Sequence, residues 1–89
     1  MFLKEKDMNN KSYFVTLFVA TELKELHFND YCDATYWSNT LIVGGSYNKY
    51  SSVLAPRWDE ALEWLINNNL HNKYVDLYNT IKNELNKFL

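Results

Sequence analysis

The hydrophobic pattern of residues 11–20 predicts a buried β-strand. This stretch, Lys-Ser-Tyr-Phe-Val-Thr-Leu-Phe-Val-Ala, is rich in β-branched and aromatic residues. Neighbouring side chains of an extended chain point to opposite faces, and here both faces would be largely apolar. A strand that is apolar on both faces is typical of the centre of a covered sheet. We therefore expect residues 11–20 to form a central strand.

The next segment, residues 22–33, fits two structures. Leu23, Leu26 and His27 recur at helical spacing, and the Thr-Glu pair before them resembles a helix start. A short strand around residues 25–28 is the alternative. The sequence leaves this choice open.

Two further strands are predicted in the middle of the chain, at residues 35–43 and 46–54. Both are rich in strand-forming residues, and the pair Gly44-Gly45 separates them. Glycine pairs between two strands are typical of hairpin turns. We expect Gly44-Gly45 and its neighbours to form such a turn.

The last third of the chain changes to a helical period. Pro56 suits a first helical position, and the acidic pair Asp59-Glu60 suits a first turn. An apolar stripe follows, which consists of Trp58, Ala61, Leu62, Leu65 and Ile66 with Trp64 at its margin. The run Asn67-Asn68-Asn69 is expected to end this helix, because asparagine tolerates the left-handed conformation.

A second helix is predicted after Asn72. Its apolar residues recur at spacings of four and three, namely Tyr74, Tyr78, Ile81, Leu85 and Phe88. A second apolar row, Val75, Leu77 and Leu89, leaves room for a homodimer or another partner contact. Together the patterns predict an α+β fold, in which a small antiparallel sheet is followed by a C-terminal αα-hairpin packed on one face. We expect a single domain over residues 11–89, preceded by a polar, frayed leader at residues 1–10.

Composition and charge exclude several classes of protein. The chain has 89 residues, 47% of them hydrophobic, and a formal net charge of −2. An acidic balance argues against a protein that gains affinity from nucleic-acid phosphates. The longest apolar stretch is too short to span a membrane, and no signal peptide is recognisable. A single cysteine, Cys32, fits a reducing compartment, so we expect a cytoplasmic protein without a membrane partner.

Catalytic residue types cluster at one place, residues 27–33. His27, Asp30, Cys32 and Asp33 lie there, but they lack the paired spacing of a zinc site and the third group that orients a nucleophile. A solvated histidine, solvated acids and a buried cysteine are the more common arrangement. We therefore expect no catalytic residue, no metal site and no cofactor.

Aromatic residues with a polar ring atom concentrate in the middle of the chain. The run from Gly44 to Ser52 combines tyrosine with Gly, Ser and Asn, which is the composition of many binding loops. An ordinary hairpin whose tyrosines pack on the core is the alternative. The candidate binding residues are Tyr36, Trp37, Tyr47, Asn48, Lys49 and Tyr50, assisted by the acidic residues Glu22, Glu25, Asp30 and Asp33.

Residues 54–65, Leu-Ala-Pro-Arg-Trp-Asp-Glu-Ala-Leu-Glu-Trp-Leu, resemble a segment of small phage and prophage proteins. In that segment a strand ends in Ala-Pro and a helix follows with an Ala-x-x-Trp-Leu step. The resemblance covers a dozen residues and carries no catalytic residue. It implies a product of a virus or mobile element, and small acidic proteins of that origin often bind a host enzyme stoichiometrically, as anti-CRISPR and other anti-defence inhibitors do.

The expected function is therefore non-enzymatic protein binding to a host enzyme in the cytoplasm, an enzyme of defence or of nucleic-acid processing. Two alternatives remain. The same aromatic residues could stack on single-stranded nucleic acid, although residues 34–58 supply only Lys49 and Arg57 as cations. A structural or oligomerising role is the other alternative.

Overall fold

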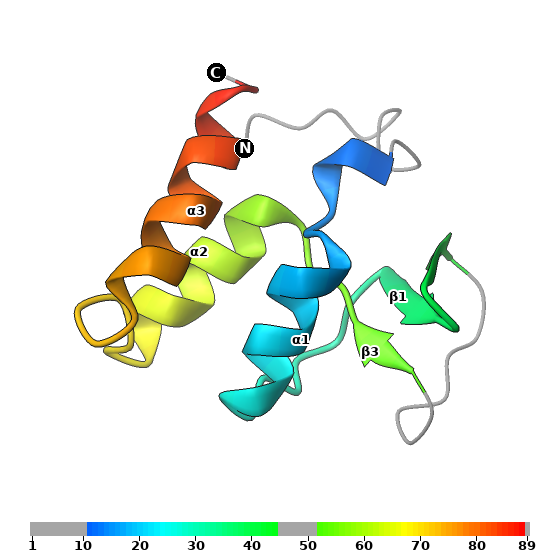
Figure 1. Ribbon diagram of the computed structural model, residues 1–89, viewed down its shortest axis with the longest axis horizontal. Coiled ribbons are helices and arrows are strands. Elements are labelled where there is room, and N and C mark those ends of the chain that lie inside the picture. The colour runs from blue at the N-terminus through cyan, green and yellow to red at the C-terminus, as the bar shows by residue number, and fades with distance from the viewer. Residues whose placement is uncertain (1–10, 45–51, 89) are drawn as a thin grey trace.

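Helices, then three antiparallel strands, then two more helices follow one another along the chain in the computed structural model (Figure 1), which describes residues 11–44 and 52–88. The elements are the 3₁₀ helix η2 (Lys11–Tyr13), α1 (Leu17–Glu25), β1 (Ala34–Trp37), β2 (Thr40–Val43), β3 (Val53–Leu54), α2 (Trp58–Asn67) and α3 (Val75–Asn86). The predicted α+β class is confirmed. The leader at residues 1–10 lies outside the described residues. No helix in the described ranges is long and apolar enough to cross a membrane.

The predicted strand at residues 11–20 is wrong, because most of this segment is helical. Thr16 caps α1: its side-chain oxygen accepts a hydrogen bond from the Val19 amide at 3.3 Å. Val19 and Leu23 are buried at a spacing of four residues, which places them on one face of α1, and Ala20 beside them is buried as well. A short apolar run cannot be assigned by periodicity alone, and the capping threonine decides for the helix. The open choice at residues 22–33 resolves into helix up to Glu25 and irregular chain after it.

The predicted strand at residues 35–43 is two strands, and the hairpin turn lies at Ser38-Asn39 rather than at Gly44-Gly45. Trp37 pairs with Thr40, so the turn has two residues, and both have positive φ (50° and 67°). Two-residue turns with positive φ match the twist of antiparallel strands. Gly44, which also has positive φ, follows β2.

The sheet order, β2-β1-β3, also departs from the predicted hairpin between the second and third strands. β3 pairs with β1 and lies on the far side of it from β2. Of the predicted strand at residues 46–54, the structure assigns β3 to Val53–Leu54, and residues 46–51 lie outside the described part of the chain.

The predicted C-terminal αα-hairpin is confirmed, as α2 and α3 pack on each other. The asparagine run ends α2 as expected. Asn69 has a φ of 57°, and the amides of Asn69 and Leu70 donate to the carbonyls of Ile66 and Leu65 at 3.1 and 2.9 Å. These two hydrogen bonds are those of a Schellman motif. Figure 1 shows all three α-helices on the same side of the strands, with α1 between α2 and β3.

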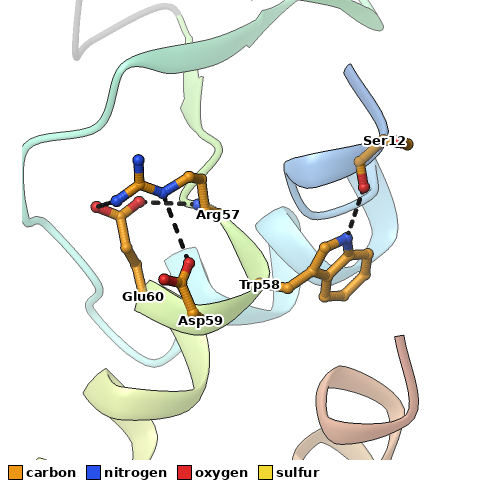
Figure 2. Close-up of polar contacts among 5 residues, drawn as sticks. All are labelled: Ser12, Arg57, Trp58, Asp59 and Glu60. Carbon is orange, nitrogen blue, oxygen red and sulfur yellow. Dashed lines mark hydrogen bonds and ion pairs between the residues drawn. The ribbon is translucent and has the colours of Figure 1, made fainter. Parts of the chain in front are cut away.

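A long-range junction joins the start of the described chain to the start of α2. Trp58, 3% exposed, donates from its indole Nε1 to the Ser12 carbonyl at 3.0 Å (Figure 2). The Val15 amide donates to the Pro56 carbonyl at 3.0 Å, and Phe14 forms an isolated antiparallel bridge with Arg57. Pro56 itself was expected at the first helical position, but α2 begins two residues later, at Trp58.

Candidate protein-binding surface and acidic groove

The end of α1 turns the chain sharply and so shapes the candidate site. His27 has a φ of 72°, and the amides of His27 and Phe28 donate to the carbonyls of Lys24 and Leu23, each at 3.0 Å. This is a second Schellman motif, and its usual apolar pair is present, because Leu23 and Phe28 are both buried. The motif fixes the direction in which residues 28–33 leave the helix.

A groove of about 480 Å³ lies between residues 28–31 and one face of α2. The rings of Phe28 and Trp64 meet edge to face there, with centroids 5.1 Å apart and planes at 83°. Tyr31, which also lines the groove, is 73% exposed. The helix residues that line the groove share one face, since they follow a spacing of three and four: Glu60, Glu63, Trp64 and Asn67.

Carboxylates from two elements gather around this groove. Asp30 comes from the segment after α1, and Glu60 and Glu63 come from α2. Two of them, Glu60 and Asp30, act on Cys32, whose pKa is raised to about 12 by burial first, then by the negative charges of Glu60, Asp30 and Asp33. Of the sequence-predicted acids, Asp30 therefore shares the groove with the carboxylates of α2, and Asp33 acts on the same cysteine from outside the groove.

Glu60 has a second, structural role at the start of α2. Its carboxylate accepts a hydrogen bond from the Arg57 amide at 2.9 Å and pairs with the Arg57 guanidinium at 3.4 Å (Figure 2). The Arg57 Nε also lies 3.5 Å from an Asp59 oxygen. Arg57 thus compensates the charge of Glu60, whereas Asp30 and Glu63 have no ion-pair partner among residues 11–44 and 52–88.

The buried cysteine that follows the groove residues Asp30 and Tyr31 in the chain is a poor nucleophile. Cys32 is 3% exposed, and its Sγ donates to the Asp30 carbonyl at 3.4 Å. With a pKa of about 12 it is a neutral thiol at neutral pH, whereas a nucleophilic cysteine acts as the thiolate. In the described part of the chain, no three His, Cys, Asp or Glu side chains are arranged to hold a metal ion.

The two aromatic candidates on β1 have different surroundings. Tyr36 is half-buried, and its hydroxyl donates to the Val15 carbonyl at 2.9 Å, so this tyrosine ties the sheet to the start of α1. Burial raises the pKa of Tyr36. Trp37 is 42% exposed, and Ile42, on β2, is 44% exposed. Trp37 pairs with Thr40 and Thr35 pairs with Ile42, so Trp37 and Ile42 are diagonal neighbours on one sheet face.

The remaining candidates lie apart from the groove or outside the described residues. Glu25 is exposed at the end of α1, and Glu22 lines a different recess, beside Phe18 and the start of α3. Tyr47, Asn48, Lys49 and Tyr50 fall in residues 45–51, outside the described part of the chain. The structure therefore places Asp30 at the groove and puts Glu22 and Glu25 elsewhere, while Asp33 lies outside the groove lining.

Sequence reasoning missed the contribution of α2 to this site. Glu60 was read as a helix-start residue, Trp64 as the margin of the apolar stripe, and Glu63 was not considered. The spacing of residues 60, 63, 64 and 67 was a usable signal, because it places two carboxylates and an indole on one helix face.

Protein-family models, curated proteins and solved structures were each compared with the chain, and none matched it.

Proposed function

We propose that this chain is a non-enzymatic protein-binding module that acts by stoichiometric binding to a host enzyme of defence or nucleic-acid processing. The observation that carries the proposal is the pair Trp37 and Ile42, which are diagonal neighbours on one face of the sheet and are both more than two-fifths exposed. Tryptophan is enriched among interface residues that dominate binding energy. An exposed Trp–Ile pair on a strand hairpin has the character of such an anchor.

The hairpin that carries this pair is well suited to binding. Its turn has only two residues, and Trp37 and Thr40, which flank the turn, are paired across the two strands. A side chain held on a paired strand loses little freedom when a partner binds, which reduces the entropic cost of association.

The tyrosine-rich segment supports the proposal from the sequence side. Residues 45–51 connect β2 to β3, two strands of the same sheet as Trp37. Tyr47 and Tyr50 offer large contact area with few rotatable bonds. If both contribute to the interface, alanine at each should weaken binding by about 2 kcal/mol.

The acidic groove indicates the chemistry of the partner. Asp30 and Glu63 are uncompensated among the described residues, and the whole chain is also acidic. Negative groups steer association toward a positively charged surface. A nucleic-acid-processing enzyme presents such a surface in the groove that meets phosphates, and the phage-like segment at residues 54–65 agrees with a partner of this kind.

The test begins with affinity capture from host lysate and continues with the purified partner. We expect a 1:1 or other fixed-ratio complex by light scattering, and a loss of affinity of about 2 kcal/mol in the double variant Trp37→Ser/Ile42→Thr. The matched control is Phe18→Ser/Val75→Thr, which changes two exposed apolar residues on α1 and α3. This control should bind like the wild type.

Two results would contradict the proposal. One is that both double variants bind the partner with equal affinity, since the Trp–Ile pair would then contribute no specific binding energy. The other is wild-type binding to single-stranded nucleic acid that weakens steeply with salt, which is the behaviour of the alternative function.

A further inference from the structure

The acidic groove between residues 28–31 and α2 has the features of a receptor for one cationic side chain. Its volume, about 480 Å³, is sufficient for a long side chain and the water around it. Its lining joins carboxylates to aromatic rings, and none of the described residues that line it is a lysine or arginine. A groove of this composition is complementary to positive charge.

The carboxylates lie on both sides of the groove. Asp30 belongs to the segment after α1, and Glu63 belongs to α2, so a cation between them would meet a negative charge from each wall. Neither residue has an ion pair within residues 11–44 and 52–88, whereas Glu60 is already paired with Arg57. The charges available to a ligand are therefore those of Asp30 and Glu63.

The aromatic rings add a second element of recognition. The edge of one ring meets the face of the other in the Phe28–Trp64 pair, which holds the indole in place beside the groove. Tyr31 is 73% exposed and can cover a bound side chain. Tryptophan and tyrosine faces attract cations, and guanidinium also stacks on them.

We propose that this groove binds the side chain of an arginine presented by the partner protein. Arginine fits better than lysine, because its planar guanidinium can stack on a ring while its fork of donors reaches a carboxylate. The pKa of nearby Cys32, raised first by burial and then by the charges of Glu60, Asp30 and Asp33, agrees with a negative potential beside Asp30 and Glu60. The inference rests on the proposed function, but it can be tested without the partner.

The experiment is a titration of the full-length protein, followed by nuclear magnetic resonance, with a blocked Gly/Ser peptide that holds one central arginine. The matched ligand holds citrulline, which has the shape of arginine without its charge. We expect saturable shifts of the Trp64 indole and Asn67 side-chain amide signals with the arginine peptide, weaker binding in high salt, and no saturation with the citrulline peptide.

Variants localise the binding. Glu63→Gln should weaken binding of the arginine peptide roughly tenfold, as expected for the loss of one charge-assisted contact. Glu25→Gln makes the same charge change at an exposed position outside the groove and should leave binding unchanged. Thermal unfolding of both variants checks that each is folded, which we expect because both side chains are exposed.

The inference is overturned if citrulline and arginine peptides bind alike, if Glu63→Gln and Glu25→Gln have equal effects, or if a lysine peptide binds as tightly as the arginine peptide. Failure of the inference is distinguishable from failure of the proposed function. Suppose that the partner binds in a manner that depends on Trp37 and Ile42, but that no arginine peptide binds. That result would overturn only the inference. Arginine binding without any fixed-ratio protein complex would leave the groove as a cation site and overturn the proposed function.

Discussion

Cys32 should react far more slowly in the folded protein than in the unfolded chain. Two features of the fold protect it: the side chain is 3% exposed, and its pKa is raised from the ordinary 9.0 to about 12 by burial and by nearby carboxylates. Because the thiolate is the reacting species, a raised pKa lowers the fraction of cysteine that can react.

The size of the effect follows from the two pKa values. At about pH 8, roughly a tenth of the unfolded thiols but only about one in ten thousand of the folded thiols are ionised, a difference of about a thousandfold. A more basic thiolate is a better nucleophile, which offsets about twentyfold of this difference. The folded protein should therefore react roughly 50-fold more slowly, before steric shielding slows it further.

The assay is the release of coloured thiolate from dithionitrobenzoate, with and without denaturing urea. It reports on one site, because Cys32 is the single cysteine of the chain. Asp33→Asn is a useful comparison, since it removes one of the charges that raise the pKa of Cys32 and should speed the native reaction modestly. Equal rates in the folded and unfolded states would refute the buried, carboxylate-flanked position of Cys32.

The same pKa predicts a pH dependence of stability. The folded-state pKa is raised, so the neutral thiol contributes its full stability below about pH 9 and loses it as the pH rises toward 12. Lysines and tyrosines titrate in the same range, so the contribution of Cys32 is the difference between wild type and Cys32→Ala. The free energy of unfolding of the wild type should fall more steeply in this range than that of the variant.

Three further predictions concern stability, measured as the free energy of unfolding in urea. Tyr36→Phe removes the hydroxyl that donates to Val15 and should cost about 1 kcal/mol, and no loss would mean that the bond does not hold the sheet to α1. His27→Gly should stabilise the protein by about 1 kcal/mol because φ is 72° there, while His27→Val should destabilise it; the opposite order would contradict the Schellman geometry. Leu65→Ala should cost about 3 kcal/mol or more because Leu65 is fully buried, whereas Ile66→Ala, at an exposed position, should cost under about 1 kcal/mol.

The C-terminal half of the fold was predictable because its signals are local and agree with one another. The apolar residues of α2 and α3 follow helical spacing over several turns, and the asparagine run supplies a residue that tolerates positive φ at position 69. The α+β class followed from the change of period near Pro56. Each of these features can be read within a window of a few residues.

The N-terminal half was less predictable because its decisive contacts are distant in sequence. The composition of residues 11–20 predicts a strand. In the structure, however, the hydrogen bonds of this segment are made with residues far away in the sequence: the Val15 amide donates to the Pro56 carbonyl, and the Trp58 indole donates to the Ser12 carbonyl. The hairpin turn was assigned to Gly44-Gly45 because glycine pairs are the stronger signal, and Ser38-Asn39 was passed over. Only one side of the groove was predicted. Asp30 was named as a candidate, but the α2 residues opposite it come near Asp30 only when the chain folds.

The junction between residues 12–15 and the start of α2 has a consequence for the order of events during synthesis. The Trp58–Ser12 hydrogen bond spans 46 residues, and closing a loop of that length costs roughly 3 kcal/mol of chain entropy. A ribosome adds those residues in roughly 2 to 9 seconds, far longer than a helix takes to form. For much of that interval α1 is complete, but β3, which it contacts, and α2 have not yet been made. Its apolar row of Val19, Ala20 and Leu23 is then available to chaperones, and folding is complete only after Trp58 has left the ribosome.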